Sequence, residues 1–589
     1  EKRNPNQRKR LEKRYITQLS HRNLRADTFR MIHSTMSRSS SYNLLIVVAT
    51  IIFFSPITLN GLSVPCSYYL LQGATQSILA TMRQSSSGHS YIEPLHATSS
   101  SEEEQQNHLN GLKVGIVGGG PSGLLLSHKL LQSGASSISI FESRNDPRAT
   151  QSNLEGRAYA LGVGIRGRSA IRSVDDKLWN SVKKRGYESD RFTLCVSPTI
   201  KLKLRDGPKT SSFWRKKDGE MTQEPSLLMY QSDLCSVLLE ELEARYQQIK
   251  EKNGTDDCDC DLNFGTKVMN VDITNRMIQT MNKENEKTSS HGPFDLLVGC
   301  DGVNSPVRTA IESNAPPQTF TCEVKSLPGE FKVARLDSVP PNLDPTSVSL
   351  LLPKKGKSTA FVEPTVNNGA CILFAGRDVE DDPILTSNPV TLQNLTMDSI
   401  VECFPLLEGS VGTTDIIQQL KTQCSASASS VKCNTYHYDC AVLCGDAAHA
   451  TGGVSGNGLN SALLDAIVLS QCLESNFDTQ NKALSIQSSL LSYSQKQVPE
   501  GLALYDLAFG STGELTLIQQ FSFIFRNVLN FLFGGKFGIG QPQLQVQLAS
   551  SSRSFASIRR DRGYAYAETF PTDEMFRKNL AELYDDKRI

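Results

Sequence analysis

A glycine-rich turn between an apolar strand and a helix constrains this chain more than any other feature. Residues 112–117 form an apolar run short enough for a buried strand, and residues 118–123 follow as GGGPSG. Leucines at helical spacing come next, and a second apolar run over residues 138–141 ends at Glu142. A GxGxxG pattern indicates a dinucleotide site when it stands in this order of strand, tight turn, helix, strand and acid. The sequence therefore predicts a Rossmann-like parallel sheet that binds a dinucleotide.

Each residue of this pattern has an expected task. Gly118 allows the tight turn, Gly120 lets the backbone approach a pyrophosphate, and Gly123 lets the helix pack on the strand. The free N–H groups and positive dipole end of the helix favour the phosphates. Glu142 is expected to accept hydrogen bonds from the ribose hydroxyls. The alternative is a plain glycine-rich turn in a parallel sheet.

Composition excludes several classes of protein. The chain has 589 residues, enough for more than one core, and its 61 basic and 61 acidic residues give no reason to expect a nucleic-acid partner. Its 14 cysteines are scattered, which is not the density of a disulfide scaffold. Cys258 and Cys260 lack the spacing and the partner pair of a metal site, so we expect no metal.

Residues 1–110 are expected to be a basic leader that precedes the globular part. An apolar run over 44–59 contains Pro56 and suits the core of a signal peptide, with a retained membrane anchor as the alternative. The following stretch, 67–101, is rich in Ser and Thr and resembles a transit peptide. A plastid address through signal plus transit peptide is therefore favoured, and a mitochondrial leader or an endoplasmic reticulum anchor are the alternatives. Residues 99–110 are expected to serve as a linker into the first strand.

The remaining patterns predict an α/β protein with a second, mostly antiparallel layer. Helices are expected over 165–179, 227–246, 395–404 and 414–420, and from 461 and 496 onward. Short β-rich runs at 192–204, 331–336, 347–352 and 371–374 predict a substrate layer built from about 190–225 and 317–432 and inserted into a domain spanning 111–510. Residues 511–589 are expected to hold an apolar helix at 515–533, which caps the core or lies on a membrane, and a charged tail from 550 that extends along the surface.

Two further motifs follow predicted strands. Residues 294–308 read as a buried strand, an Asp-Gly turn at Asp301 and a helix that starts at Ser305. Residues 438–443 are another strand, which runs into Asp446 and a loop crowded with glycines up to Gly458. Taken alone, each motif is as well explained by a turn that only redirects the chain.

The three motifs stand in one order at wide spacing: GGGPSG, then VGCDGVNSPVR at 298–308, then GDAAHATGGVSGNGLN at 445–460. Together they resemble the FAD-dependent aromatic-ring hydroxylases, the single-component flavoprotein monooxygenases. Within that group, the stretches GRAYALGVGIRGRSAI at 156–171 and SVKCNTYHYDCAVLCGDAAHA at 430–450 are most similar to the kynurenine 3-monooxygenases. The resemblance covers about 112–507. It implies a Rossmann-like FAD-binding domain with an inserted antiparallel β-sheet substrate layer and a C-terminal helical region.

The resemblance also implies roles for individual residues. The ADP part of FAD would be held by the residues of the first motif, Gly118, Gly120, Gly123 and Glu142. Arg157 and Gln231 would lie along the flavin diphosphate. Asp301 would sit near the pyrophosphate and the nicotinamide nucleotide, and Asp446 would bind the ribityl chain. Gly458, Leu459 and Asn460 would meet the pyrimidine edge of the ring. His449 receives no catalytic role.

By the same resemblance, NAD(P)H and O₂ would be co-substrates for hydroxylation of an aromatic small molecule, kynurenine-like as the first expectation. Arg191 lies within one residue of the arginine that grips the substrate carboxylate in that family. The chain departs from the family pattern at Gly453, where the pattern has proline, and at Asn457, where it has glutamine. Two alternatives stay open: an FAD-dependent epoxidase or reductase acting on an apolar isoprenoid, and a flavin-binding protein without turnover that associates with a membrane through 44–59 or 515–533.

Overall fold

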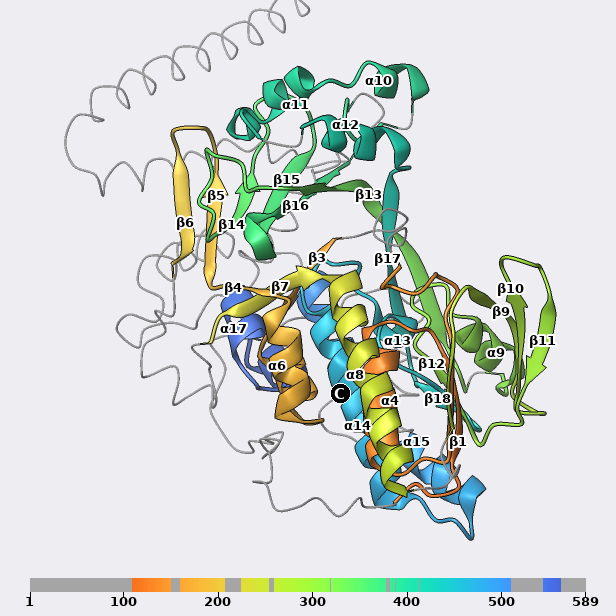
Figure 1. Cartoon of the computed structure of the whole chain (residues 1–589). Coiled ribbons are helices and arrows are strands. Elements are labelled where there is room, and N and C mark those ends of the chain that lie inside the picture. The colour runs from red at the N-terminus through yellow and green to blue at the C-terminus, as the bar shows by residue number, and fades with distance from the viewer. Residues whose placement is uncertain are drawn as a thin grey trace, which may run out of the picture. The chain divides into compact units, whose positions relative to one another are not determined.

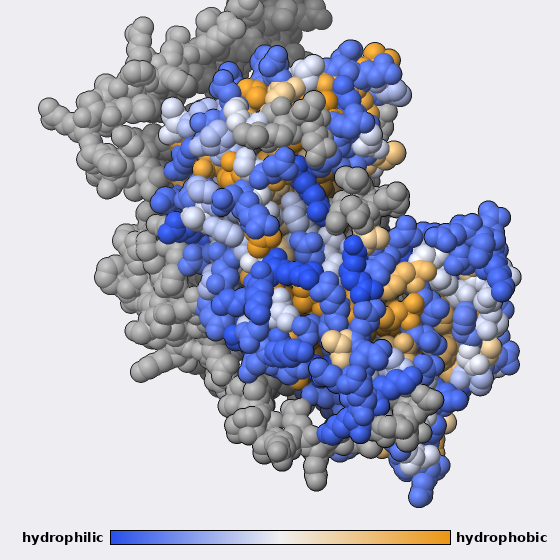
Figure 2. All heavy atoms as spheres, in the orientation of Figure 1, coloured by the Kyte–Doolittle hydropathy of each residue, from blue (hydrophilic) through white to orange (hydrophobic). Residues whose placement is uncertain are grey.

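The computed structural model describes residues 108–149, 159–206, 224–253, 259–317, 319–377, 382–386, 388–410, 413–509 and 544–562. The segments 44–59 and 515–533, for which membrane roles were expected, lie outside these residues, as does Arg157. Within the described residues no helix is both long and apolar enough to cross a membrane. One face of the molecule is mostly hydrophilic, with hydrophobic side chains showing in scattered clusters (Figure 2).

A six-stranded, mainly parallel sheet carries the three motifs (Figure 1). Its strands, in spatial order, are β18 (His437–Tyr438), β19 (Ala441–Leu443), β12 (Leu296–Gly299), β1 (Lys113–Val117), β2 (Ser137–Phe141) and β8 (Asp259–Asn263). All neighbours pair in parallel except β18 and β19. The central strands β12, β1 and β2 are short and nearly all buried, as expected for a parallel sheet covered on both faces. The predicted Rossmann-like sheet is confirmed.

Four long helices accompany this six-stranded sheet: α4 (Pro121–Gln132), α8 (Gln231–Asn253), α14 (Gly458–Asn476) and α15 (Lys482–Phe509). Helix α4 packs against both α8 and α14, which lie beside it in Figure 1. The shorter α9 (Pro306–Asn314) begins as predicted, with Ser305 accepting a hydrogen bond from the Arg308 N–H and Pro306 in the first turn.

The second sheet has seven strands. Their spatial order is β17 (Ala426–Cys433), β13 (Cys322–Leu336), β16 (Ala370–Gly376), β15 (Thr359–Pro364), β14 (Val348–Leu351), β5 (Arg191–Cys195) and β6 (Lys201–Asp206). It is antiparallel apart from the β14–β5 pair, so the expected inserted layer is confirmed. Helices α10 (Pro389–Gln393), α11 (Met397–Cys403) and α12 (Thr413–Thr422) and the 3₁₀ turns η2 (Val366–Asn368) and η4 (Pro405–Leu407) lie among its strands in the sequence.

Two three-stranded sheets complete the described strands. One is formed by β3 (Ala160–Val163), β7 (Ser226–Tyr230) and β4 (Tyr187–Ser189). The other is formed by β11 (Thr288–His291), β10 (Met277–Asn282) and β9 (Thr266–Asp272). The first of these sheets borders both of the cavities described below, because residues of β3 line each of them.

The helix expected over 227–246 is wrong at its start. Residues 226–230 form strand β7, which pairs with β3 and β4, and the helix begins only at Gln231. A short apolar run reads equally well as strand or helix, and only the partner strands decide between them.

The single helix expected to reach Trp179 is also wrong. The chain forms α5 (Ile165–Arg172) and α6 (Asp176–Lys184), separated at residues 173–175. Asp175 caps α6 by accepting a hydrogen bond from the Leu178 N–H at 2.6 Å. An aspartate gains more as an N-cap than inside a helix, so the break falls at this residue.

The described part of the C-terminal tail is not a surface extension. Helices α17 (Leu544–Ser550) and α18 (Phe555–Arg562) follow the described end of α15, and Phe555 and Ile558 are buried in a cluster with residues of α15. Arg559 forms an ion pair with buried Asp506 at 2.8 Å. Burial of two large apolar side chains explains why this charged stretch docks on the protein.

Candidate cofactor and substrate site

A cavity of about 810 Å³ opens where the central strands end. Parallel α/β sheets bind ligands at the carboxyl ends of their strands. The lining of this cavity brings together most of the residues that the motifs singled out: Gly118, Gly120, Glu142, Gln231, Asp301, Asp446, Gly458 and Leu459. These come from segments more than 300 positions apart in the sequence, and the fold alone places them around one space.

The three glycines of the first motif have different environments. Gly118 has φ of +104°, and a Cβ there would overlap the Cys300 carbonyl. A Cβ on Gly123 would overlap the Gly118 carbonyl oxygen, so that glycine lets α4 approach the turn. Gly120 has open space where a Cβ would stand, and it borders the cavity. The backbone at Gly120 is therefore accessible to a ligand, as expected for a pyrophosphate.

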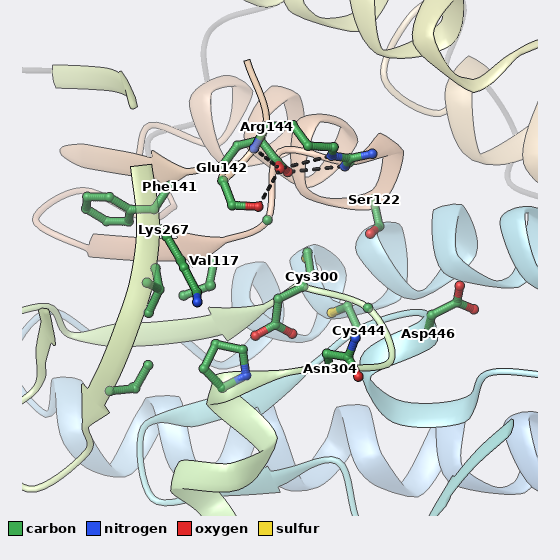
Figure 3. Close-up of a pocket in the computed structure, with 18 of the residues that line it drawn as sticks. Val117, Ser122, Phe141, Glu142, Arg144, Lys267, Cys300, Asn304, Cys444 and Asp446 are labelled. Carbon is green, nitrogen blue, oxygen red and sulfur yellow. Dashed lines mark hydrogen bonds and ion pairs between the residues drawn. The ribbon is translucent and has the colours of Figure 1, made fainter. Parts of the chain in front are cut away.

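Glu142 lies at the end of β2 with its carboxylate already engaged (Figure 3). Its Oε2 accepts a hydrogen bond from the Gly119 N–H at 2.9 Å, and its Oε1 accepts from the backbone N–H and the Nε of Arg144 at 2.8 and 3.0 Å. Burial alone would raise the pKa of Glu142, but the hydrogen bonds and charge of Arg144 lower it overall. The carboxylate therefore stays ionised and fixed.

Asp301 follows β12 by two residues and also lines the cavity. Its Oδ2 accepts a 3.3 Å hydrogen bond from the Val307 N–H at the start of α9. Its buried Oδ1 has no hydrogen-bond partner among the described residues. Burial raises the pKa of Asp301 to about 6, despite hydrogen bonds from Ser305 and Val307. A buried acceptor without a partner at a cavity wall is suited to a donor on a ligand.

Asp446 begins the one-turn helix α13 (Asp446–His449), which starts three residues after the end of β19. Its side chain is open to the cavity but otherwise surrounded by protein, and this loss of bulk solvent raises its pKa. The turn that presents it is closed by Asp465 of α14, which accepts hydrogen bonds from the Gly445 N–H at 2.9 Å and from His449 Nε2 at 2.6 Å. His449 thus contacts a carboxylate rather than the cavity.

The first turn of α14 separates two cavities. Gly458 and Leu459 face the large one, whereas Asn457 and Asn460 line a second cavity of about 160 Å³. Asn460 accepts a hydrogen bond from the Gly164 N–H at 2.8 Å and donates one to the Gly162 carbonyl at 3.0 Å. Its side chain therefore ties α14 to the end of β3, while the helix N-terminus keeps free N–H groups.

The loop before α14 takes a conformation that proline cannot. Gly453 has φ of +80°, and Gly452 and Gly456 have φ of +57° and +61°. Proline holds φ near about −65°. The departure at Gly453 from the aromatic-ring hydroxylase pattern is therefore a change of backbone shape as well as of residue. Asn457 bonds within the loop, donating to the Ser455 carbonyl at 3.0 Å.

The second cavity is lined by two arginines of the seven-stranded sheet. Arg191 in β5 donates a 2.7 Å hydrogen bond to Thr346 and is about half exposed. Arg205 in β6 stands opposite Phe192 in the neighbouring strand, and burial lowers its pKa. The sequence pointed to Arg191 and missed Arg205, because their common cavity depends on the pairing of β5 with β6.

Two more cationic residues line the large cavity without having been predicted. Arg144 follows Glu142 by two positions and could have been found as an acid–arginine pair at the end of the second strand. Lys267 comes from β9, in a separate sheet, and nothing in its local sequence marks it (Figure 3). Together they bring positive charge to a cavity suited to phosphate groups.

The residues present fit FAD. The cavity has the open backbone at Gly120, the fixed carboxylate of Glu142 and two helix N-termini, those of α4 and α14. Neither of these helices has a side-chain cap, which leaves first-turn N–H groups for a ligand. Asp301 supplies a buried acceptor that needs a partner.

Comparison with known proteins agrees with this geometry. A family model described as an FAD binding domain matches residues 111–506. The kynurenine 3-monooxygenase of Neurospora crassa is 25% identical over 418 residues, which cover 67% of this chain and 77% of that protein. That of Cryptococcus neoformans is 24% identical over 444 residues, covering 68% and 78%. A solved structure of 2-methyl-3-hydroxypyridine-5-carboxylic acid oxygenase shares the fold with a TM-score of 0.51 at 16% identity, covering 77% of this chain and 98% of that chain.

Proposed function

The chain belongs to the family defined by this FAD binding domain and is an FAD-dependent oxidoreductase, and we propose that it uses NAD(P)H and O₂ to hydroxylate a small aromatic acid. The observation that carries this proposal is the shared wall between the two cavities. Strand β3 and the first turn of α14 face the large cavity through Leu161 and Leu459 and the small one through Gly162 and Asn460. A cofactor in one and a substrate in the other would meet across this wall.

The charge of the small cavity favours an acidic substrate. Arg191 and Arg205 both line it, and guanidinium groups bind carboxylates with paired hydrogen bonds. Its volume of about 160 Å³ favours a compact molecule, such as a single ring with a short acidic chain. A kynurenine-like acid is the first candidate because the relatives named above are kynurenine 3-monooxygenases.

Bound FAD would supply the electron transfer from NAD(P)H and the activation of O₂. The chain's own residues would bind and orient. Glu142 and the turn at Gly118–Gly120 would hold the adenosine and the diphosphate, with Arg144 keeping the carboxylate in place. The N-terminus of α14 would favour negative charge on the adjoining ring edge. Arg191 and Arg205 would fix the substrate by its acid group.

The test uses the purified full chain with bound FAD. NADPH consumption and oxygenated product are followed with kynurenine, with its decarboxylated analogue kynuramine and with an apolar isoprenoid alkene. We expect hydroxylation of the acid, and a loss of about 10-fold or more in kcat/KM for Arg205→Gln, since a charged hydrogen bond contributes about 1.5–3 kcal/mol. Turnover of kynuramine should be nearly unaffected by the same substitution.

Other outcomes point elsewhere. An epoxide from the alkene, without reaction of the acid, would favour the epoxidase alternative. If the protein binds FAD tightly but oxidises NADPH with none of these substrates, the result would favour a flavin-binding protein without turnover. Failure of the protein to bind FAD would contradict the proposal and both alternatives.

A further inference from the structure

Cys322 and Cys433 face each other across two antiparallel strands, and we propose that a peroxide converts them into a reversible disulfide. Cys322 is the first residue of β13 and Cys433 is the last residue of β17. The two are directly paired in the register of these strands. This pair lies outside both cavities, so the inference does not depend on the proposed function.

The pair occupies the type of position where side chains approach most closely. Beside it, the Asn434 N–H donates to the Thr321 carbonyl at 3.1 Å, which makes Thr321 and Asn434 a hydrogen-bonded pair. Two residues before Cys433, the Val431 N–H donates away from β13, to the Ala450 carbonyl at 2.9 Å. Hydrogen-bonded and non-hydrogen-bonded pairs alternate along an antiparallel ladder. Cys322 and Cys433 are therefore a non-hydrogen-bonded pair.

Such a pair has a separation that a disulfide can span. Cα atoms in non-hydrogen-bonded pairs are about 4.5 Å apart. Disulfides join residues whose Cα atoms are about 4.4–6.8 Å apart. The bond can form without moving either strand far, because the two side chains already lie on the same face of the sheet.

The surroundings make one thiol the nucleophile and the other its partner. Cys322 is partly exposed, whereas Cys433 is buried. The interaction with Cys433 and the charge of Arg308 lower the pKa of Cys322, although burial opposes this. Burial raises the pKa of Cys433. Since the thiolate is the reactive form, Cys322 reacts with an oxidant first.

The chemistry needs only a peroxide. The Cys322 thiolate attacks one oxygen of hydrogen peroxide, the O–O bond breaks, and hydroxide leaves a sulfenic acid on Cys322. The Cys433 sulfur then attacks that sulfenic sulfur, the S–O bond breaks, and the hydroxyl leaves with the Cys433 proton as water. Two thiols are oxidised and one peroxide is reduced. Thiol reductants reverse the step by exchange.

A second pair of thiols is close enough to compete. Cys300 and Cys444 each stand one position beyond the Gly299–Leu443 pair of the parallel strands β12 and β19, and they interact. Both line the large cavity (Figure 3). A bound cofactor would cover them, so we assign the oxidation to Cys322 and Cys433.

The experiment is peroxide titration of the reduced full chain with bound FAD. After each dose free thiols are alkylated, the protein is digested, and peptides are quantified by mass spectrometry. Exposed Cys424 serves as the internal control for non-specific oxidation. We expect a peptide linking Cys322 to Cys433, lost on reduction, at a peroxide dose at least several-fold below that which modifies half of Cys424. Cys433→Ser should instead leave a sulfenic acid on Cys322 that dimedone captures.

Three results would overturn the proposal. The first is that Cys322 and Cys433 both remain alkylatable at doses that oxidise Cys424. The second is that Cys322 proceeds to sulfinic acid in the wild-type chain. The third is that the linked peptide joins Cys300 to Cys444. Mapping the wild-type chain decides among these even if Cys433→Ser does not fold.

Discussion

His449 and Asp465 form a buried pair, with Nε2 and Oδ2 2.6 Å apart, that closes the turn presenting Asp446 to the cofactor cavity. Asp465 also accepts from the Gly445 N–H, so one carboxylate fixes both ends of this turn. Asp446 and His449 both lie on α13, whereas Asp465 lies on α14, so the pair ties one helix to the other. The pair explains why a histidine in this motif needs no role in the reaction.

The His449–Asp465 pair should make stability depend on pH. Burial alone would lower the pKa of His449, but the Asp465 charge and hydrogen bond raise it overall from the ordinary 6.5. A raised folded pKa gives stability that is complete below about pH 6.5 and is lost as pH rises through the folded pKa. Urea unfolding from pH 6 to 9 should show this loss. Asp465→Asn should abolish it and lower stability by about 3 kcal/mol.

The control for that prediction is Glu402→Gln, which breaks the exposed pair with Lys355 and should not change stability measurably. An Asp465→Asn protein with wild-type stability and an unchanged pH profile would contradict the assigned role of the pair.

Substitutions at the first glycines should separate folding from binding. Gly118→Ala places a Cβ against the Cys300 carbonyl at φ of +104°, and we expect it to lower the free energy of unfolding by more than about 2 kcal/mol. Gly120→Ala meets no atom of the protein, so stability without FAD should change by less than about 0.5 kcal/mol. Its FAD affinity, measured by flavin fluorescence, should fall at least about 10-fold because the backbone must approach the diphosphate. Equal FAD affinity in Gly120→Ala and wild type would contradict this placement.

Loss of the Glu142 charge should weaken the binding of FAD. Glu142→Gln removes the ionised acceptor that holds Gly119 and Arg144, so we expect FAD affinity to fall by about 10-fold or more. Glu243→Gln is the matched control, because Glu243 also pairs with an arginine but lies on the surface. A similar effect of both substitutions would show that Glu142 acts only through general charge.

Replacing Gly453 by the proline of the related family pattern should destabilise this loop. Gly453→Pro cannot keep φ of +80°, and we expect a loss of about 2–3 kcal/mol in stability together with lower turnover. Gly453→Asn is the control, since asparagine tolerates this backbone region and a Cβ here meets open space. Differential scanning calorimetry and NADPH turnover check both variants. Full activity of Gly453→Pro would show that the loop readily adopts another shape.

Local features of the fold could be predicted because neighbouring residues specify them. The strand, glycine turn and helix around Gly118 and the capped start of α9 at Ser305 depend on backbone preferences and apolar spacing within about ten residues. The same local reading failed at residues 226–230. There the apolar run suited both strand and helix, and pairing with β3 and β4 made it a strand.

The sequence by itself determined the dinucleotide motif, the order of the three motifs and the fold class, because each motif is a short-range pattern and the order of the motifs follows directly from the chain. Only the tertiary structure decided which side chains meet. It tied Asn460 to β3, brought Arg205 into the cavity that Arg191 lines, and set Cys322 opposite Cys433. The physical reason is that these contacts depend on strand register and helix packing, which fix distances between residues that their own neighbours in the chain do not constrain.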